Sequence, residues 1–114
     1  MEKLVLSIKF TTKPENSAQF KQVLKDLFNR IKLEPNFINA TIHEVLGKPE
    51  EFMLYETWND TIEHFMNVQM KKPYALAYEQ TLIDMDVKRE PAAFIPFAYF
   101  GTHIIKDKNQ MGCF

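Results

Sequence analysis

The strand that ends on the only tryptophan of the chain constrains the fold most. Side chains alternate between two faces along the segment Phe52 to Trp58, so Phe52, Leu54, Glu56 and Trp58 share one face. This face combines large apolar side chains with a carboxylate, and a carboxylate is costly to bury without a partner. We therefore expect Glu56 to form a hydrogen bond to the backbone or to a side chain of a partner subunit.

A helix is expected directly after this strand. Asp60 and Glu63 have the spacing of a capping box, with Asp60 as the cap. An apolar stripe that includes Ile62 and Phe65 follows, and it is broken at Pro73. The stripe resumes after this proline and continues to about residue 86. The pattern thus predicts two consecutive helical segments after the strand.

The first half of the chain predicts a strand, a helix and a hairpin. Residues 3–11 alternate as a half-buried strand, and residues 14–33 repeat apolar side chains at helical spacing. Residues 37–46 form a second strand, and the turn at residues 47–50 leads back into the strand 51–58. Strict alternation places Phe37 on the face opposite Ala40 and Ile42.

The order of these elements predicts an α+β fold of the ferredoxin-like kind, a split βαβ sandwich with an antiparallel sheet. The aromatic segment 92–104 is expected to supply the last strand, at an edge because of Pro96. Residues 1–104 would be one domain and residues 105–114 a polar tail. All helices would lie on one face of the sheet. The bare face would carry apolar side chains and favour a homodimer: Val5, Phe37, Val45, Met53 and Tyr55.

Composition excludes several classes of partner. The net charge of −1 gives no footprint for nucleic acid or an anionic membrane, and Lys72, Lys88 and Arg89 fit a solvated surface. No signal peptide or transmembrane run is visible, and the single cysteine, Cys113, indicates a reducing compartment. We expect a cytoplasmic protein in which Cys113 is not a nucleophile, because nothing nearby would lower its pKa.

Aromatic residues are unusually frequent, with 10 Phe and 4 Tyr among 114 residues. A core of this size rarely needs so many rings, so they line a cavity or are covered by a partner. The histidines and carboxylates lack the spacing of a metal site, and the glycines form no phosphate loop. We expect no metal and no nucleotide.

The run Leu54-Tyr55-Glu56-Thr57-Trp58-Asn59-Asp60, followed by a helix and then by Pro73-Tyr74, resembles the antibiotic biosynthesis monooxygenase family over about residues 1–87. The resemblance implies a dimeric α/β barrel, in which two ferredoxin-like sheets pack face to face and small apolar ligands bind between sheet and helices. It also implies oxidation of a small aromatic or quinol-like compound by dioxygen, without a cofactor. The catalytic residues stay unassigned.

Candidate ligand contacts follow from this resemblance. Seven residues would wall the pocket or offer it polar groups: Trp58, Asn67, Tyr74, His43, Tyr55, Phe52 and Phe65. Many members of the family have histidines where this chain has Asn67 and Tyr74, and neither replacement is a good base near pH 7. The haem-degrading branch is disfavoured, because Ser7 replaces an asparagine and Asn67 or Val68 replaces the ligating histidine.

Two other functions therefore stay open. One is a non-catalytic module of the same fold, which binds a small apolar ligand or serves as a stress-related dimer. The other is an isomerase or decyclase-like enzyme with His43 as its base.

Overall fold

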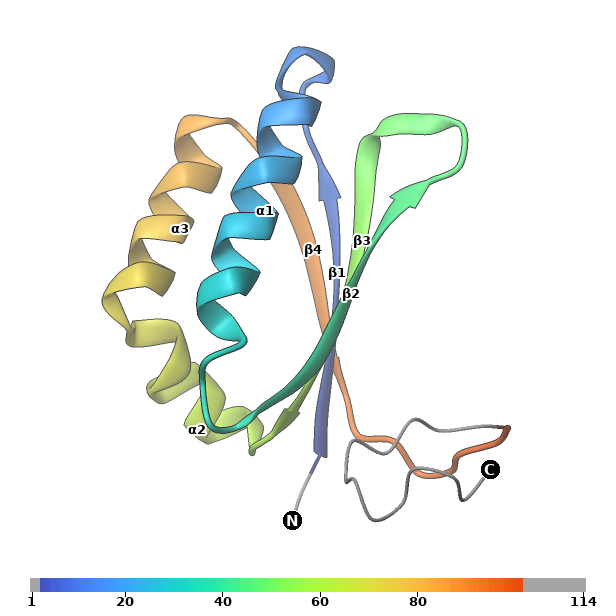
Figure 1. The fold of residues 1–114 in the computed structure, drawn as a ribbon, viewed down its shortest axis with the longest axis vertical. Coiled ribbons are helices and arrows are strands. Elements are labelled where there is room, and N and C mark those ends of the chain that lie inside the picture. The colour runs from blue at the N-terminus through green and yellow to red at the C-terminus, as the bar shows by residue number, and fades with distance from the viewer. Residues whose placement is uncertain (1–2, 102–114) are drawn as a thin grey trace.

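The alternating segments of the sequence form a sheet, and the segments with helical spacing form a layer on one side of it (Figure 1). The computed structural model describes residues 3–101. The strands are β1 (Lys3–Thr11), β2 (Phe37–Val45), β3 (Lys48–Asn59) and β4 (Lys88–Phe94). The α-helices are α1 (Ser17–Ile31), α2 (Ile62–Asn67) and α3 (Pro73–Asp84), and the 3-10 turns are η1 (Pro14–Asn16) and η2 (Gln69–Lys71).

The sheet has the order β2-β3-β1-β4, and every neighbouring pair is antiparallel. The ferredoxin-like α+β fold is thereby confirmed. The register places Leu4 opposite Trp58, Leu6 opposite Glu56 and Phe10 opposite Phe52. These facing pairs line up on the side that the helices cover, where side chains from α1 and α3 complete the core.

The last strand was expected in the wrong place. The strand β4 begins at Lys88 and ends at Phe94, whereas the aromatic pattern suggested residues 92–104. Residues 95–101 form no strand, and they lead away from the helix layer on the side of the bare sheet face (Figure 1). The predicted domain end at residue 104, the polar tail 105–114 and Cys113 lie outside the described residues.

A β-bulge corrects the expected position of Phe37. The pairing of β2 with β3 shifts between Phe37 and Asn39, so that Phe37 pairs with Trp58 while Ala40 pairs with Glu56. The extra residue, Ile38, reverses the alternation at this point. Phe37 therefore lies on the helix side, edge-to-face with Trp58 at 5.2 Å between ring centroids. It is not part of the bare face.

The helix after Trp58 begins one residue later than the sequence suggests. Thr61 is the cap, because its Oγ1 accepts a hydrogen bond from the backbone N–H of His64 at 3.1 Å. Asp60 instead accepts a hydrogen bond from the backbone N–H of Thr61, and its Oδ1 lies 2.8 Å from Nδ1 of His64. The short helix α2 ends at Asn67, the turn η2 follows, and Pro73 begins α3, as proline suits a first turn.

The core divides into two clusters along the sheet. One cluster contains Phe10, Phe20, Leu24 and Phe52. The other contains Trp58 and Phe65. Among the described residues, no helix is long and apolar enough to cross a membrane.

Candidate active site

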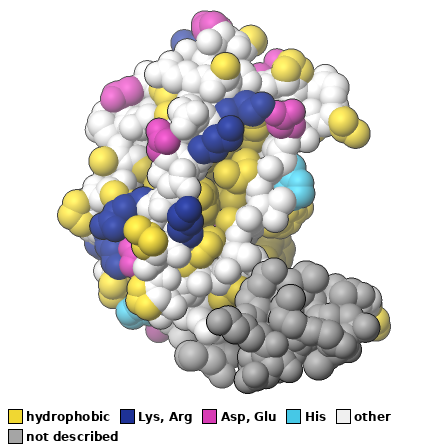
Figure 2. All heavy atoms as spheres, in the orientation of Figure 1, with side chains coloured by type: hydrophobic (Ala, Val, Ile, Leu, Met, Phe, Trp, Pro, Cys, Tyr) yellow, Lys and Arg dark blue, Asp and Glu magenta, His cyan; other side chains and the backbone are white. Residues whose placement is uncertain are grey.

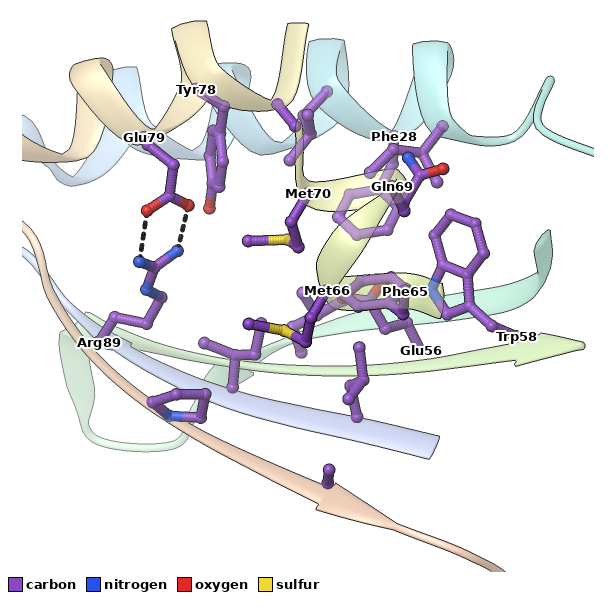
Figure 3. A pocket seen from close by; sticks show the side chains of 18 of the residues that line it. Phe28, Glu56, Trp58, Phe65, Met66, Gln69, Met70, Tyr78, Glu79 and Arg89 are labelled. Atoms are coloured by element: carbon purple, nitrogen blue, oxygen red, sulfur yellow. Dashed lines mark hydrogen bonds and ion pairs between the residues drawn. The ribbon is translucent and has the colours of Figure 1, made fainter. Parts of the chain in front are cut away.

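A cavity of about 380 Å³ lies between the sheet and the helix layer, beside the core cluster that contains Trp58 and Phe65. Its floor comes from β1, β3 and β4, and its roof comes from α1, α2, η2 and α3 (Figure 3). The apolar part of the lining includes aliphatic, aromatic and thioether side chains, among them Leu6, Leu54, Phe65, Met66 and Met70. A cavity of this size and character suits a small, mainly apolar ligand.

Glu56 is the buried carboxyl in this lining, with 5% of its surface exposed. Its Oε1 accepts a hydrogen bond from Nε1 of Trp58 at 2.6 Å. This partner was not foreseen, since we expected the backbone or a second subunit. Burial raises the pKa of Glu56 to about 7, although the bond from Trp58 acts in the opposite direction. The carboxyl is therefore partly protonated and partly ionised at neutral pH.

Tyr78 presents a hydroxyl to the cavity from α3 (Figure 3). Its oxygen is buried and has no hydrogen-bond partner among the described residues. Burial raises the pKa of Tyr78, so the hydroxyl keeps its proton at neutral pH. A buried hydroxyl without a partner is costly, and a ligand oxygen in the cavity would supply the missing acceptor.

Arg89 and Glu79 form the polar end of the cavity beside Tyr78 (Figure 3). The guanidinium donates two hydrogen bonds to the carboxylate, each 2.6 Å long. Hydrogen bonding to Glu79 raises the pKa of Arg89, so the cation is permanent. Arg89 was expected to be solvated surface. It instead lies on the helix side of β4, because it pairs with Phe10 of β1 in the register.

A hydrogen-bonded group centred on Glu34 closes the opposite end of the roof. We call it the Glu34 clasp, and its members are Glu34, Gln69, Lys72 and Tyr74. Tyr74 donates to Oε2 of Glu34 at 2.5 Å, Lys72 donates to Oε1 at 2.7 Å, and Gln69 donates to the tyrosine oxygen at 2.5 Å. Burial, followed by the bond to Glu34, raises the pKa of Tyr74 to about 12. The clasp ties the start of α3 to the loop after α1.

The structure brings together three of the seven residues that the sequence suggested as ligand contacts. Trp58, Phe65 and Tyr74 line the cavity. Asn67 is exposed at the end of α2 and is not part of the lining, and Phe52 lies in the other core cluster.

The remaining two suggested contacts, His43 and Tyr55, lie on the bare face of the sheet. Their rings meet edge-to-face at 5.7 Å between centroids. They are therefore separated from the cavity by the sheet itself. Both side chains lie at the surface of the sheet, and neither lines the cavity.

Four polar groups of the site were not foreseen: Gln69, Tyr78, Glu79 and Arg89. Tyr78 stands one helical turn after Tyr74, so the helical stripe contained the signal for its direction. The pairing of Glu79 with Arg89 had no such signal, because it depends on how β4 pairs with β1. Within residues 3–101, no group of three or more His, Cys, Asp or Glu side chains could hold a metal ion.

Comparisons with known proteins agree with this architecture. Residues 4–72 match the model of the antibiotic biosynthesis monooxygenase family. A protein of Pestalotiopsis microspora, named as a candidate monooxygenase, is 28% identical over 81 residues, which cover 71% of this chain and 68% of that protein.

Solved structures give the same fold at low sequence identity. A variant of SnoaB from Streptomyces nogalater, described as a cofactor-independent oxygenase, superposes with a TM-score of 0.75 at 17% identity and covers 90% of this chain and 100% of its own. A candidate antibiotic biosynthesis monooxygenase from Deinococcus radiodurans gives a TM-score of 0.74 at 17% identity, covering 90% of this chain and 98% of its own.

Proposed function

The chain belongs to the antibiotic biosynthesis monooxygenase family, and from this premise we propose that it is a cofactor-independent monooxygenase acting on a small hydroxylated aromatic or quinol-like compound. The observation that carries the proposal is the apolar cavity between sheet and helices, with the buried carboxyl of Glu56 in its wall. The description of SnoaB as a cofactor-independent oxygenase supports the reaction class.

In this proposal, Glu56 is the general base. A base works best when its pKa lies near the operating pH, and the pKa of Glu56 is about 7. The bond from Nε1 of Trp58 fixes Oε1, while Oε2 has no hydrogen bond to another described residue. Oε2 is thus the atom that accepts the proton of a substrate hydroxyl.

Tyr78 and Arg89 bind a second oxygen of the substrate. The hydroxyl of Tyr78 donates to this oxygen, and the nearby guanidinium of Arg89 stabilises negative charge that develops on it. Glu79 holds Arg89 with two hydrogen bonds, so the cation is fixed before the substrate binds. Charge stabilisation is strong in such an apolar setting, because little water screens it.

The reaction needs only dioxygen besides the substrate. Deprotonation by Glu56 makes the ring an electron-rich anion, which passes electrons to dioxygen. One oxygen atom enters the substrate as a carbonyl, the other leaves as water, and the substrate loses two hydrogen atoms. The apolar walls formed by Phe65, Met66 and Met70 exclude water from the anion and from reduced oxygen.

A specific observation also supports a second candidate, a ligand-binding module without chemistry. Neither residue at the two positions where many family members have histidine can act as a free base in the cavity. Asn67 is outside the cavity lining, and the hydroxyl of Tyr74 is bonded to Glu34. Proton abstraction would then depend on Glu56 alone, and without it the cavity would only bind a ligand.

Oxygen uptake separates the two candidates. We would titrate para-quinols and hydroxynaphthalenes into the protein, following binding by the fluorescence of Trp58 and turnover with an oxygen electrode. The monooxygenase proposal predicts uptake that falls about 100-fold in Glu56→Gln while binding persists. Binding without uptake across the panel would favour the module, and the absence of both would reject the cavity as the site.

We further propose that the protein is a cytoplasmic homodimer joined through the bare face of its sheet. Val5, Met53, Tyr55 and Phe94 lie on this face, and Tyr55 and Phe94 are 47% and 50% exposed. A symmetric dimer would cover these side chains at once, since the same patch serves both copies.

A further inference from the structure

A second depression lies on the outer edge of the fold, between α1 and the edge strand β2. This groove measures about 450 Å³ and is open to solvent. Its apolar lining consists of Phe28, Phe37, Ala40 and Ile42, all of them only half-buried. Figure 2 shows hydrophobic side chains recessed between the helix layer and the sheet, with basic side chains along the helix.

The helix side of the groove is positively charged. Lys25 and Lys32 line it, with Asn29 between them. They are seven residues apart, Lys25 within α1 and Lys32 at its C-terminal cap with helical backbone angles, so they lie on the same face and about 10 Å apart along the axis. Neither lysine has an ion-pair partner within residues 3–101, and no carboxylate is part of the lining. The net charge of the whole chain is −1, so the positive charge of the two lysines is a local feature of this groove.

The bulge at Ile38 makes the groove apolar. Because it turns Phe37 toward the helix side, the ring of Phe37 joins Ala40 and Ile42 under α1 rather than facing the bare sheet. Without the bulge, this end of the groove would lack its aromatic wall.

One aromatic wall separates the groove from the central cavity. Phe28 lines both spaces, and Phe37 packs against Phe28 and against Trp58, with ring centroids 6.2 Å and 5.2 Å apart. A molecule in the groove would therefore press on rings that also shape the cavity.

We propose that this groove is a second binding site, which takes a single amphipathic carboxylate with its apolar body on Phe28, Phe37 and Ile42 and its charge between Lys25 and Lys32. Charge complementarity selects an anion, because two lysines without an ion-pair partner in residues 3–101 line the groove and none of its described lining residues is acidic. The recessed shape suits one free molecule rather than the flat surface of a bilayer. The proposal goes beyond the monooxygenase reaction and does not depend on it.

Calorimetric titration with decanoate tests the proposal, with decan-1-ol as the uncharged analogue. We expect decanoate to bind the whole protein and decan-1-ol to bind at least 10-fold more weakly. The double substitution Lys25→Glu with Lys32→Glu should weaken decanoate at least 10-fold. The matched control is Lys13→Glu with Lys71→Glu, which changes the net charge equally on exposed lysines outside the groove and should leave binding unchanged.

A second variant tests the apolar contact independently. Ala40→Phe fills the groove while keeping both lysines, and it should abolish decanoate binding. Amide chemical shifts should change around Lys25, Phe37 and Ala40 when decanoate is added. The proposal is overturned if decanoate does not bind, if the charge reversal has no effect, or if the shifts map to the central cavity. It is also overturned if the charge reversal changes the sedimentation of the free protein, since a second copy would then occupy the groove.

Discussion

Glu56 is a buried carboxyl whose pKa is raised, and this has a consequence for stability. The folded pKa of about 7 exceeds the ordinary value of 4.5, so the folded protein holds a proton that the unfolded chain releases between these values. The protonated carboxyl contributes stability that is fully present below pH 4.5 and is lost as the pH rises through about 7. The shift corresponds to about 3 kcal/mol.

Glu56→Gln should remove this pH dependence, because the amide is neutral throughout. We expect the melting temperature of the native protein to fall relative to the variant as the pH rises from 4.5 to 7.5, measured by scanning calorimetry. Glu63→Gln is the control, since Glu63 is exposed on α2. A difference between Glu56→Gln and the native protein that stays constant over this range would contradict a raised pKa.

Removing the hydroxyl of Tyr78 should have opposite effects on the stability of the free protein and on ligand binding. Its buried hydroxyl has no partner within the described part of the chain, so Tyr78→Phe should stabilise the free protein by about 1 kcal/mol and weaken the binding of a hydroxylated aromatic ligand. The contrasting variant is Tyr74→Phe, which removes the hydroxyl bonded to Glu34 and Gln69 and should destabilise the protein. Urea unfolding of both variants makes the comparison. A destabilised Tyr78→Phe would mean that the hydroxyl has a partner in the fold.

For single residues, the sequence predicted which face of the sheet a side chain occupies better than which side chain it contacts. The alternation of β3 correctly placed Phe52, Leu54, Glu56 and Trp58 on the covered face. It could not identify Trp58 as the partner of Glu56, because that bond depends on rotamers within the packed core. Arg89 was overlooked because its orientation is set by the pairing of β4 with β1, and the aromatic pattern that follows obscured the start of β4. Tyr78 was part of the predicted helical stripe, but its place in the cavity lining depends on how α3 packs on the sheet.

Among the elements, α3 depends on the Glu34 clasp for the position of its first turn. The bonds from Lys72 and Tyr74 lower the pKa of Glu34, so the stability they contribute is present above pH 4.5 and is lost as the pH falls through the lowered folded pKa.

Glu34→Gln should destabilise the protein by about 1 kcal/mol at pH 7, because the charge that pairs with Lys72 is removed. Faster hydrogen exchange at Leu76, whose N–H bonds the carbonyl of Lys72, should accompany the loss. The difference from the native protein should shrink as the pH falls below 4.5 and through the lowered pKa of Glu34. Glu15→Gln, at an exposed carboxylate before α1, is the control. Equal exchange at Leu76 in the native and Glu34→Gln proteins would mean that the clasp does not hold α3.

The elements were predictable from local patterns, and their exact pairing was not. Periodicity identified β1, α1, the hairpin of β2 with β3, and the break at Pro73. The bulge at Ile38 has no local signature in the sequence, because it arises from how β2 meets β3. The cap was predicted at Asp60 and is Thr61. The sequence could not distinguish them, since both residue types can cap a helix.

For the whole molecule, the proposed homodimer depends on the bare face of the sheet. If two copies pack through it, Tyr55→Glu should convert the dimer to a monomer in analytical ultracentrifugation, because each copy would bring a buried, unpaired charge into the interface. Leu76→Glu is the matched control, since Leu76 is an equally exposed apolar residue on the outer side of α3. An unchanged dimer in Tyr55→Glu would move the interface elsewhere.

The central claim, that Glu56 is the base in an oxidation that occurs within the cavity, is tested most directly by the pH dependence of oxygen uptake. With a quinol that binds the protein, kcat/KM of the native protein should rise with pH and level off above an apparent pKa of about 7. Glu56→Gln should retain roughly 1% of this activity, with no inflection near pH 7. An unchanged inflection and rate in Glu56→Gln would contradict the assignment of Glu56 as the base.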